Sequence, residues 1–226
     1  MNSTLSLPEQ IRQILALQND VIELALQDPE RISHYTKECT DLLRQFRYRS
    51  IHLPSINMRY GENERGRCEQ LLEIAKAIDA HTVVLHPDIV DDFSFVDRVF
   101  GSLIAVENMD RDKHFGQTIE TLEESFEHLP NARWVFDVNH IFTLDPTMRL
   151  ADGFYHKFSS RIAHYHLSGF GGRALRHIPL VETKQTIIAQ NVVQSAVPVV
   201  IESVRQEEPV TLEQEYSYCK NLIQPR

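Results

Sequence analysis

The chain contains few residues of several types, and the lack of long apolar runs and of basic residues excludes two classes of protein. Its 226 residues include 3 cysteines, 1 tryptophan and 8 glycines. No apolar run reaches the ~18 residues that a membrane-spanning helix needs. Basic residues are also in deficit, because 23 Lys and Arg stand against 32 Asp and Glu and leave a formal charge of −9. That balance argues against nucleic acid or any other partner held mainly by neutralisation of its phosphates.

The cysteines and the first residues bear on the compartment. Cys39, Cys68 and Cys219 are odd in number and widely spaced in helical patterns, so we expect buried free thiols of a reducing environment. The opening residues MNSTLSLPEQ lack the basic start and the apolar core of a signal peptide. These features predict a cytoplasmic protein without a membrane partner.

Apolar residues alternate between extended and helical spacing along the whole chain. Short strands rich in β-branched residues are expected at 21–26, 48–54, 81–87, 102–109, 133–138, 161–168 and 198–204. Helical spacing lies between them, as at 28–46, 92–100 and 211–223, and Ser6 with Glu9 forms a capping box. Because the strands are continuous apolar runs that start roughly 20 to 37 residues apart, they predict parallel βα units.

This alternation fits either a doubly wound open sheet or a (β/α)8 TIM barrel, both of the α/β class. No glycine-rich turn follows an early strand, so the dinucleotide fingerprint is missing and no nucleotide cofactor is expected. Polar residues end at least six strands, which favours the barrel. Only MNSTL precedes the first helix, so we predict one barrel domain over 1–226 whose first strand is short or missing. The N-terminal helix or a second subunit, in a homo-oligomer, is expected to cover the exposed edges.

Residues that commonly ligate metals stand at the carboxyl ends of the expected strands. In chain order they are Glu23, His52, His86, Glu107, Asp137 with His140, His164 with His166, His177 in the following loop, and Glu202. Parallel strands bring all these ends to one rim of a barrel. Imidazole mixed with carboxylate suits zinc, manganese, cobalt or iron(II), whereas calcium needs an all-oxygen site. The pattern predicts a divalent-metal site, with zinc or manganese favoured.

Each of these residues alone has a simpler interpretation. A single histidine at a strand end is more often a hydrogen-bonded core or rim residue, and a lone glutamate can be paired with arginine. The case for a metal rests on the joint pattern, because ligand types at equivalent positions of independent strands rarely coincide. For His164, which lies deeper than His166 on the same side of its strand, core residue and ligand stay equally open.

Six segments at these strand ends occur in a characteristic order: IHLPS, VVLHPD, IAVENMD, VFDVNH, HYHLSGF and VVIES. Together they resemble the xylose isomerase-like TIM barrel superfamily over residues 20–205, nearly the whole chain. That superfamily holds sugar isomerases and epimerases and the zinc enzyme endonuclease IV (AP endonuclease family 2). The resemblance implies a metal bound by a four-ligand set: Glu107, Asp137, His166 and Glu202.

The endonuclease IV-like branch implies further ligands and shows one departure. His52 and His86 match positions that hold a second zinc, which the glutamate matching Glu107 bridges to the first. His140 and His177 match two ligands of a third zinc. The nuclease branch has an aspartate two residues before the second of these, where this chain has Leu175. A third zinc would then be under-ligated, which weakens a phosphodiester-cleaving assignment.

The first functional hypothesis is a metal-dependent isomerase or epimerase of a sugar or sugar phosphate. Such an enzyme stabilises the enediolate that remains when a proton is removed beside a carbonyl. The resemblance supports Glu107 and Glu202 as the base and acid, and His140 is a further catalytic candidate. Three histidines are candidates for binding substrate hydroxyls: His52, His86 and His177.

The segment 57–67 carries Arg59, Arg65 and Arg67 near the expected rim. Arg59 is the leading candidate there to bind a substrate phosphate or carboxylate. The other interpretation of the segment is a solvated loop, and the sequence leaves both open.

The second hypothesis is a zinc phosphodiesterase acting on abasic DNA, in which His52, His86 and Glu107 hold a second ion. The charge of −9, Leu175 and the lack of a basic, aromatic-rich loop count against a DNA substrate. The sequence therefore favours the sugar isomerase. A degenerate barrel that binds metal without turnover is the third alternative, and retention of all four core ligands argues against it.

Overall fold

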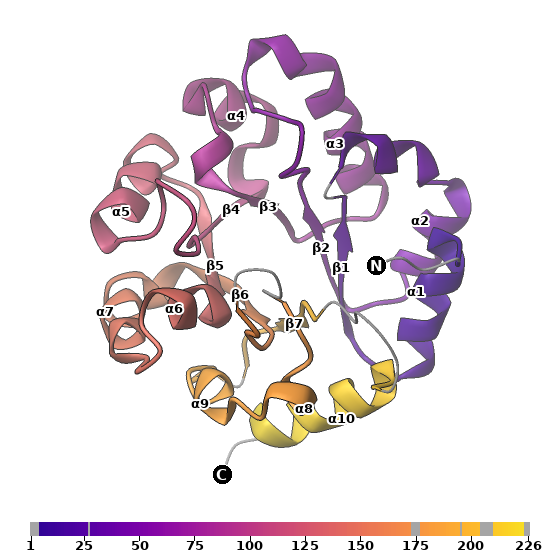
Figure 1. Cartoon of the computed structure of the whole chain (residues 1–226). Helices are drawn as coiled ribbons and strands as arrows, with labels where there is room; N and C mark the ends of the chain where they lie inside the picture. The colour runs from indigo at the N-terminus through magenta and orange to yellow at the C-terminus, as the bar shows by residue number, and fades with distance from the viewer. Residues whose placement is uncertain (1–4, 27, 173–176, 195, 204–209, 224–226) are drawn as a thin grey trace.

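Seven parallel strands run in chain order around the inner wall of the computed structural model (Figure 1). They are β1 (Val21–Ala25), β2 (Tyr48–His52), β3 (Thr82–Leu85), β4 (Ile104–Glu107), β5 (Arg133–Asp137), β6 (Ile162–Leu167) and β7 (Val199–Ile201). Each strand pairs in parallel with the next one along the chain. The structure describes residues 5–26, 28–172, 177–194, 196–203 and 210–223.

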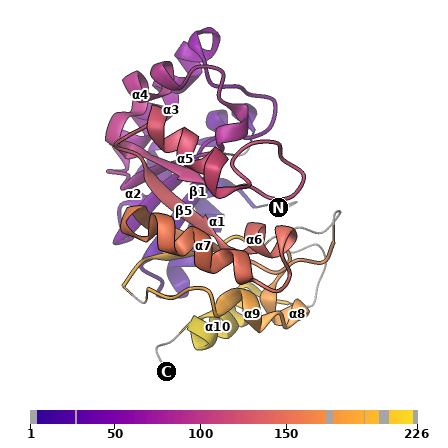
Figure 2. The same cartoon turned by 90° about the vertical axis from the view of Figure 1, so that its left-hand side faces the viewer.

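The helices form the outer layer around the strands, and the late helices α8 to α10 lie together at one side (Figures 1 and 2). The α-helices are α1 (Leu7–Ala16), α2 (Lys37–Leu43), α3 (Arg65–Ala77), α4 (Phe93–Phe100), α5 (Ile119–His128), α6 (Val138–Leu144), α7 (Arg149–Phe158), α8 (Leu180–Thr183), α9 (Thr186–Ala189) and α10 (Leu212–Ile223). Short 3-10 turns are η1 (Pro29–His34), η2 (Glu62–Glu64), η3 (Pro87–Ile89), η4 (Gly101–Leu103) and η5 (Ser159–Arg161). Parallel strands that alternate with helices confirm the predicted barrel.

The first helix begins where the capping box predicts. The backbone nitrogen of Ser6 donates to the Glu9 carboxylate at 2.7 Å, and the Ser6 side chain caps the helix in return. Of the residues described before α1, Leu5 and Ser6 lie in no strand, and residues 1–4 are outside the described ranges. Within the described chain, the barrel therefore lacks its first strand, as predicted.

The missing strand leaves a seam between β1 and β7. The two strands lie in contact, but no ladder joins them within the described residues. A cavity of about 450 Å³ lies there, lined by residues of α1, β1, β7 and α10. The two helices thus flank the seam, and cover by a second subunit stays a prediction.

The periodicity over 28–46 predicts one helix, and this is wrong. The structure divides the stretch into η1 and α2, because Tyr35 takes an extended conformation with φ −75° and ψ 128°. Thr36 then caps a new helix by accepting a hydrogen bond from the backbone nitrogen of Cys39. Side-chain capping here overrides the apolar spacing.

The core has two parts that frame the functional rim. The larger part packs the outer faces of the strands against the helices, and its largest buried side chain is Trp134. Inside the barrel a small second cluster contains Val84, Ala105, Val135 and Ala163. Polar side chains fill the rest of the interior above and beside it. No helix in the described part of the chain is long and apolar enough to cross a membrane.

Candidate metal centre

The ends of six successive strands deliver carboxylate and imidazole groups to one rim. Glu107 and Asp137 are the last residues of β4 and β5, and His52 is the last of β2. His86 and Glu202 directly follow β3 and β7, and His166 stands one residue before the end of β6. Because the strands are parallel, all of these side chains reach the same end of the barrel.

The four-ligand set lies together in the structure. One ligand atom from each of Glu107, Asp137, His166 and Glu202 lies within 4.8 Å of the others. His166 Nδ1 is 3.2 Å from Glu107 Oε1 and 3.4 Å from Glu202 Oε2. Three of the four side chains are fully buried, whereas the side chain of Glu202 is 17% exposed. The open side of the group is therefore at Glu202.

The chemistry of this set calls for a cation. Its three carboxylates carry only acceptor oxygens, and their convergence in a buried site is costly unless positive charge lies between them. Asp137 Oδ2 and Glu107 Oε2 are buried and make no hydrogen bond in the structure. Three carboxylates with one imidazole are a donor set that zinc and manganese accept, so these residues fit a divalent metal.

A second group of possible ligands shares Glu107. His52 Nε2 and His86 Nε2 lie 3.3 Å and 3.1 Å from Glu107 Oε2, and 3.1 Å from each other. His52 Nδ1 lies 2.9 Å from the carbonyl oxygen of Leu53, which can only accept, so Nδ1 carries the hydrogen. In the neutral ring that a metal ion requires, the lone pair is then on Nε2, which faces Glu107. This orientation suits a ligand.

A third group contains Asp137, His140 and His177. Asp137 caps α6 by accepting a hydrogen bond from the backbone nitrogen of His140 at 2.7 Å. His140 Nδ1 lies 2.8 Å from the carbonyl oxygen of Asn108, which leaves Nε2 to face Asp137 Oδ2 at 3.5 Å. His177 Nδ1 is 3.0 Å from the hydroxyl oxygen of Ser168. Leu175, which weighed against a third ion, lies outside the described residues.

Comparisons with known proteins identify the fold. No family model and no curated protein sequence matches the chain. A D-tagatose 3-epimerase-like protein matches 96% of this chain and 93% of its own, at 18% identity and a TM-score of 0.70. Endonuclease IV from Thermus thermophilus matches 96% of this chain and 92% of its own, at 17% identity and a TM-score of 0.69.

The probable 3-DHS dehydratase AsbF from Bacillus anthracis, involved in petrobactin synthesis, covers the whole range of the chain. It matches 100% of this chain and 96% of its own, at 14% identity and a TM-score of 0.67. This chain has the TIM barrel fold of these structures. Epimerases, a nuclease and a dehydratase share it, so the fold leaves the activity of this barrel undecided.

The electrostatics of the barrel's rim follow from burial and close charges. Burial by itself would raise the pKa of Glu107, but His166 and His86 together hold that pKa well below its usual value. Burial raises the pKa of Asp137 to about 7, and the charges of Glu107 and Glu202 add to the rise. Despite burial, Glu107 raises the pKa of His52 to about 9. The rim of this barrel thus carries an excess of negative charge, which a bound cation would relieve.

Arg59 forms an ion pair at the surface. Its side chain is 56% exposed and its guanidinium is paired with Asp91 at 2.7 Å. Arg65 and Arg67 pair with Glu62 and Glu64. Each pair is three residues apart, and the helical backbone of η2 and α3 brings such residues to the same face. All three arginines of this segment are thus ion-paired at the surface, and binding of a substrate anion by Arg59 stays a prediction.

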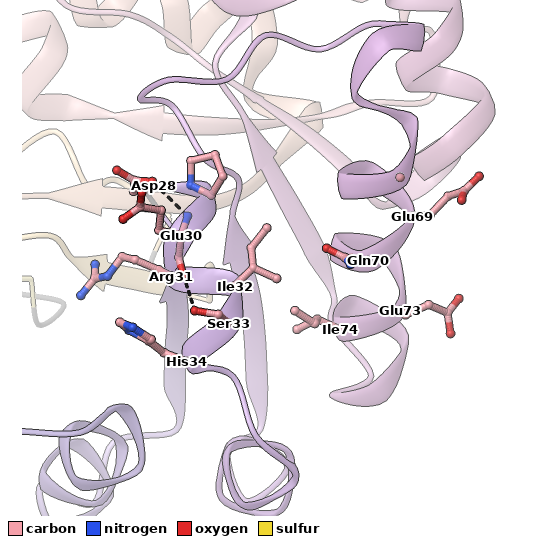
Figure 3. A pocket seen from close by; sticks show the side chains of 12 residues that line it. Asp28, Glu30, Arg31, Ile32, Ser33, His34, Glu69, Gln70, Glu73 and Ile74 are labelled. Atoms are coloured by element: carbon pink, nitrogen blue, oxygen red, sulfur yellow. Dashed lines mark hydrogen bonds between the residues drawn. The ribbon is translucent and has the colours of Figure 1, made fainter.

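A cavity of about 1230 Å³ also lies away from the rim (Figure 3). It is an open groove between η1 and α3, with Arg31 and His34 on one side and Glu69 and Glu73 on the other. None of the ligand groups lines it. The groove is therefore separate from the candidate metal centre.

Asn108 is a site residue that the sequence did not reveal. It is fully buried after β4, and its carbonyl oxygen orients the imidazole of His140. Ser168, whose hydroxyl contacts His177, is a second such residue. Asn108 adjoins Glu107 in the VENM segment and Ser168 ends HYHLS, but a lone amide or hydroxyl at a strand end carries no signal of its own.

Proposed function

We propose that this chain is a metal-dependent phosphodiesterase whose site holds at least two divalent ions. The observation that carries the proposal is that Glu107 belongs to two ligand groups and directs one carboxylate oxygen toward each of them. Its Oε1 faces His166 at 3.2 Å, while its Oε2 faces His86 at 3.1 Å and His52 at 3.3 Å. A carboxylate so placed can hold two ions side by side, which is the arrangement that metal-dependent cleavage of a phosphodiester uses.

The residues of the chain fill complementary roles in this proposal. Bound ions would activate water and neutralise the charge that develops on a phosphoryl group. Glu107, enclosed by imidazoles and fully buried, holds the two ligand groups together. Glu202 and His177 are 17% and 25% exposed at the open side, so a substrate would first meet the site there. His140 and Asp137 complete the wall between them.

An isomerase or epimerase of sugars or sugar phosphates is the second candidate. It is favoured by the partly exposed carboxylate of Glu202, which can take a proton from a carbon beside a carbonyl. Glu107 would be its partner acid, with His140 and His86 orienting hydroxyls. The formal charge of −9 also suits a small substrate better than duplex DNA. We place this candidate second because Glu107, closed in by His52, His86 and His166, is poorly placed to exchange a proton with substrate.

One set of assays separates the candidates. Protein loaded with zinc or manganese is incubated with bis(p-nitrophenyl) phosphate, with duplex DNA containing an abasic site, and with a panel of keto-sugars and sugar phosphates in D2O. We expect metal-dependent cleavage of a phosphodiester, with the two phosphodiester substrates distinguishing a small-molecule enzyme from a nuclease. Deuterium exchange into a sugar without any cleavage would overturn the proposal in favour of the isomerase.

Variants sharpen the comparison. His86→Ala removes a ligand that belongs only to the second group, so it should abolish phosphodiester cleavage. An isomerase that uses His86 only to orient a hydroxyl would lose part of its proton exchange and keep the rest. His156→Ala, on the exposed face of α7, is the matched control and should leave either activity unchanged. Full metal loading with no turnover in any assay would favour the degenerate barrel.

A further inference from the structure

A buried polar network continues inside the barrel beneath the four-ligand set. Glu23 of β1 is 3% exposed, and His164 of β6 is fully buried. Glu23 Oε1 lies 3.1 Å from His166 Nε2, and Glu23 Oε2 lies 3.2 Å from His164 Nε2. Ser50 Oγ donates a further hydrogen bond to Glu23 Oε2 at 2.7 Å. Both oxygens of Glu23 are therefore engaged, one of them by a proposed metal ligand.

The contact with Glu23 favours one of the two nitrogens of His166 as the one that carries hydrogen. Glu23 Oε1 is a charged acceptor 3.1 Å from His166 Nε2, so it favours the tautomer in which Nε2 carries the hydrogen. A neutral imidazole has one N–H, and its lone pair is then on Nδ1. That atom is the one that faces Glu107 Oε1 at 3.2 Å and Glu202 Oε2 at 3.4 Å. Glu23 thus turns the ligating nitrogen of His166 toward the place where an ion would lie.

The remaining members of the network hold Glu23 in place. His164 Nε2 lies 3.2 Å from Glu23 Oε2 and 3.1 Å from His166 Nε2, and its Nδ1 lies 2.9 Å from the hydroxyl oxygen of Tyr48. The Tyr48 hydroxyl oxygen can in turn accept from Thr82 Oγ1 at 3.0 Å. These contacts restrict the rotamers that Glu23 and His164 can adopt.

We propose that Glu23 is a positioning residue that sets the tautomer, orientation and ligand strength of His166. The inference rests on the proposed metal-dependent function. His52 and His140 direct their second nitrogen to neutral backbone carbonyls of Leu53 and Asn108. His166 instead donates to a charged carboxylate, which makes an imidazole a more basic and stronger ligand. Glu23 therefore raises the metal affinity of the four-ligand set without touching the ion.

The test is a titration with Co²⁺ followed by its visible absorption bands. Glu23→Gln keeps the size of the side chain and removes its charge, and we expect metal affinity to fall about 10- to 100-fold with altered bands. Ser50→Ala is the matched control, because it removes one hydrogen bond from the same carboxylate and leaves the charge. It should bind Co²⁺ within about threefold of the wild type. Equal affinity and an identical spectrum in Glu23→Gln would overturn the role of Glu23.

Nitrogen-15 NMR of the wild type gives a second readout that needs no variant to fold. We expect the metal-loaded protein to show His166 protonated at Nε2, and protonation at Nδ1 instead would overturn the inference.

Metal stoichiometry tests another arrangement, in which Glu23, His164 and His166 themselves enclose an ion. Loss of one whole equivalent in both Glu23→Gln and His164→Gln would show that inner ion and overturn the positioning role. A wild type that binds no Co²⁺ would refute the proposed function, whereas wild-type binding that Glu23→Gln retains in full refutes the role of Glu23 alone.

Discussion

Asn108 and Asp137 exchange two hydrogen bonds across the ends of β4 and β5. The side-chain nitrogen of Asn108 donates to the carbonyl oxygen of Asp137 at 2.8 Å, and the backbone nitrogen of Asp137 donates to Asn108 Oδ1 at 3.0 Å. The indole nitrogen of Trp134 donates to the same oxygen at 3.2 Å. One buried amide therefore fixes the backbone that presents a candidate ligand.

Replacing this amide should destabilise the protein. In Asn108→Ala the buried N–H groups of Asp137 and Trp134 lose their acceptor, so we expect the free energy of unfolding to fall by about 2–4 kcal/mol. Urea denaturation followed by circular dichroism measures it. Asn191→Ala, which removes one exposed hydrogen bond to Ile187 after α9, is the control and should cost about 0.5 kcal/mol or less. Equal losses in the two variants would contradict the role given to Asn108.

The four-ligand set should determine metal content. Protein purified without chelator is expected to contain at least one transition-metal ion per chain by elemental analysis. Glu107→Ala and His166→Ala should each lose most of that metal, because each removes a ligand that lies within 4.8 Å of the other three. His156→Ala serves as the control. If both ligand variants keep the wild-type content, the assignment fails.

The second ligand group should be separable from the first. His86 belongs to the group with His52 and Glu107 and not to the four-ligand set. His86→Ala should therefore lose one ion equivalent and keep another, as seen by elemental analysis or by anomalous diffraction at the zinc edge. His34→Ala, on the exposed surface of η1, should lose none. Complete metal loss in His86→Ala would show that the two groups do not bind independently.

Arg59 should have little effect on function. Its partner is Asp91, and the two side chains are 56% and 53% exposed, so solvent screens their attraction. Arg59→Ala is expected to change KM less than about twofold and the free energy of unfolding by less than about 1 kcal/mol. Steady-state kinetics on whichever substrate proves active measures the first quantity. A tenfold rise in KM would restore Arg59 as a substrate-binding residue.

The three thiols should be unreactive in the folded protein. Cys39, Cys68 and Cys219 are free and fully buried, as the sequence predicted. Burial raises the pKa of Cys68 to about 12, so only about one molecule in 10⁴ is a thiolate at pH 8. A thiol reagent should label none of them in native protein and all three in denaturant. Rapid labelling of a native thiol would contradict the packing described for these helices.

Local sequence determined the order of the elements. Continuous apolar runs predict the strands, and all seven occur where they are expected, with ends that differ by a few residues. The pairing of consecutive parallel strands then brings their carboxyl ends together, so residues such as Glu107 and His166 could be recognised as neighbours from their positions alone. Strand ends are predictable in this way because the periodicity of side chains and the direction of the strands are set locally.

The tertiary structure decided which atoms face one another. The sequence places Glu23 at a strand end but does not show that it contacts His166, since that depends on how β1 and β6 face each other across the barrel. It suggests Arg59 as a rim residue, whereas the packing of 57–67 directs that side chain to Asp91. The division of Glu107 between two ligand groups is likewise set by the rotamer that its neighbours allow. Side-chain direction arises from contacts between elements distant in the chain, and for that reason only the folded barrel reveals it.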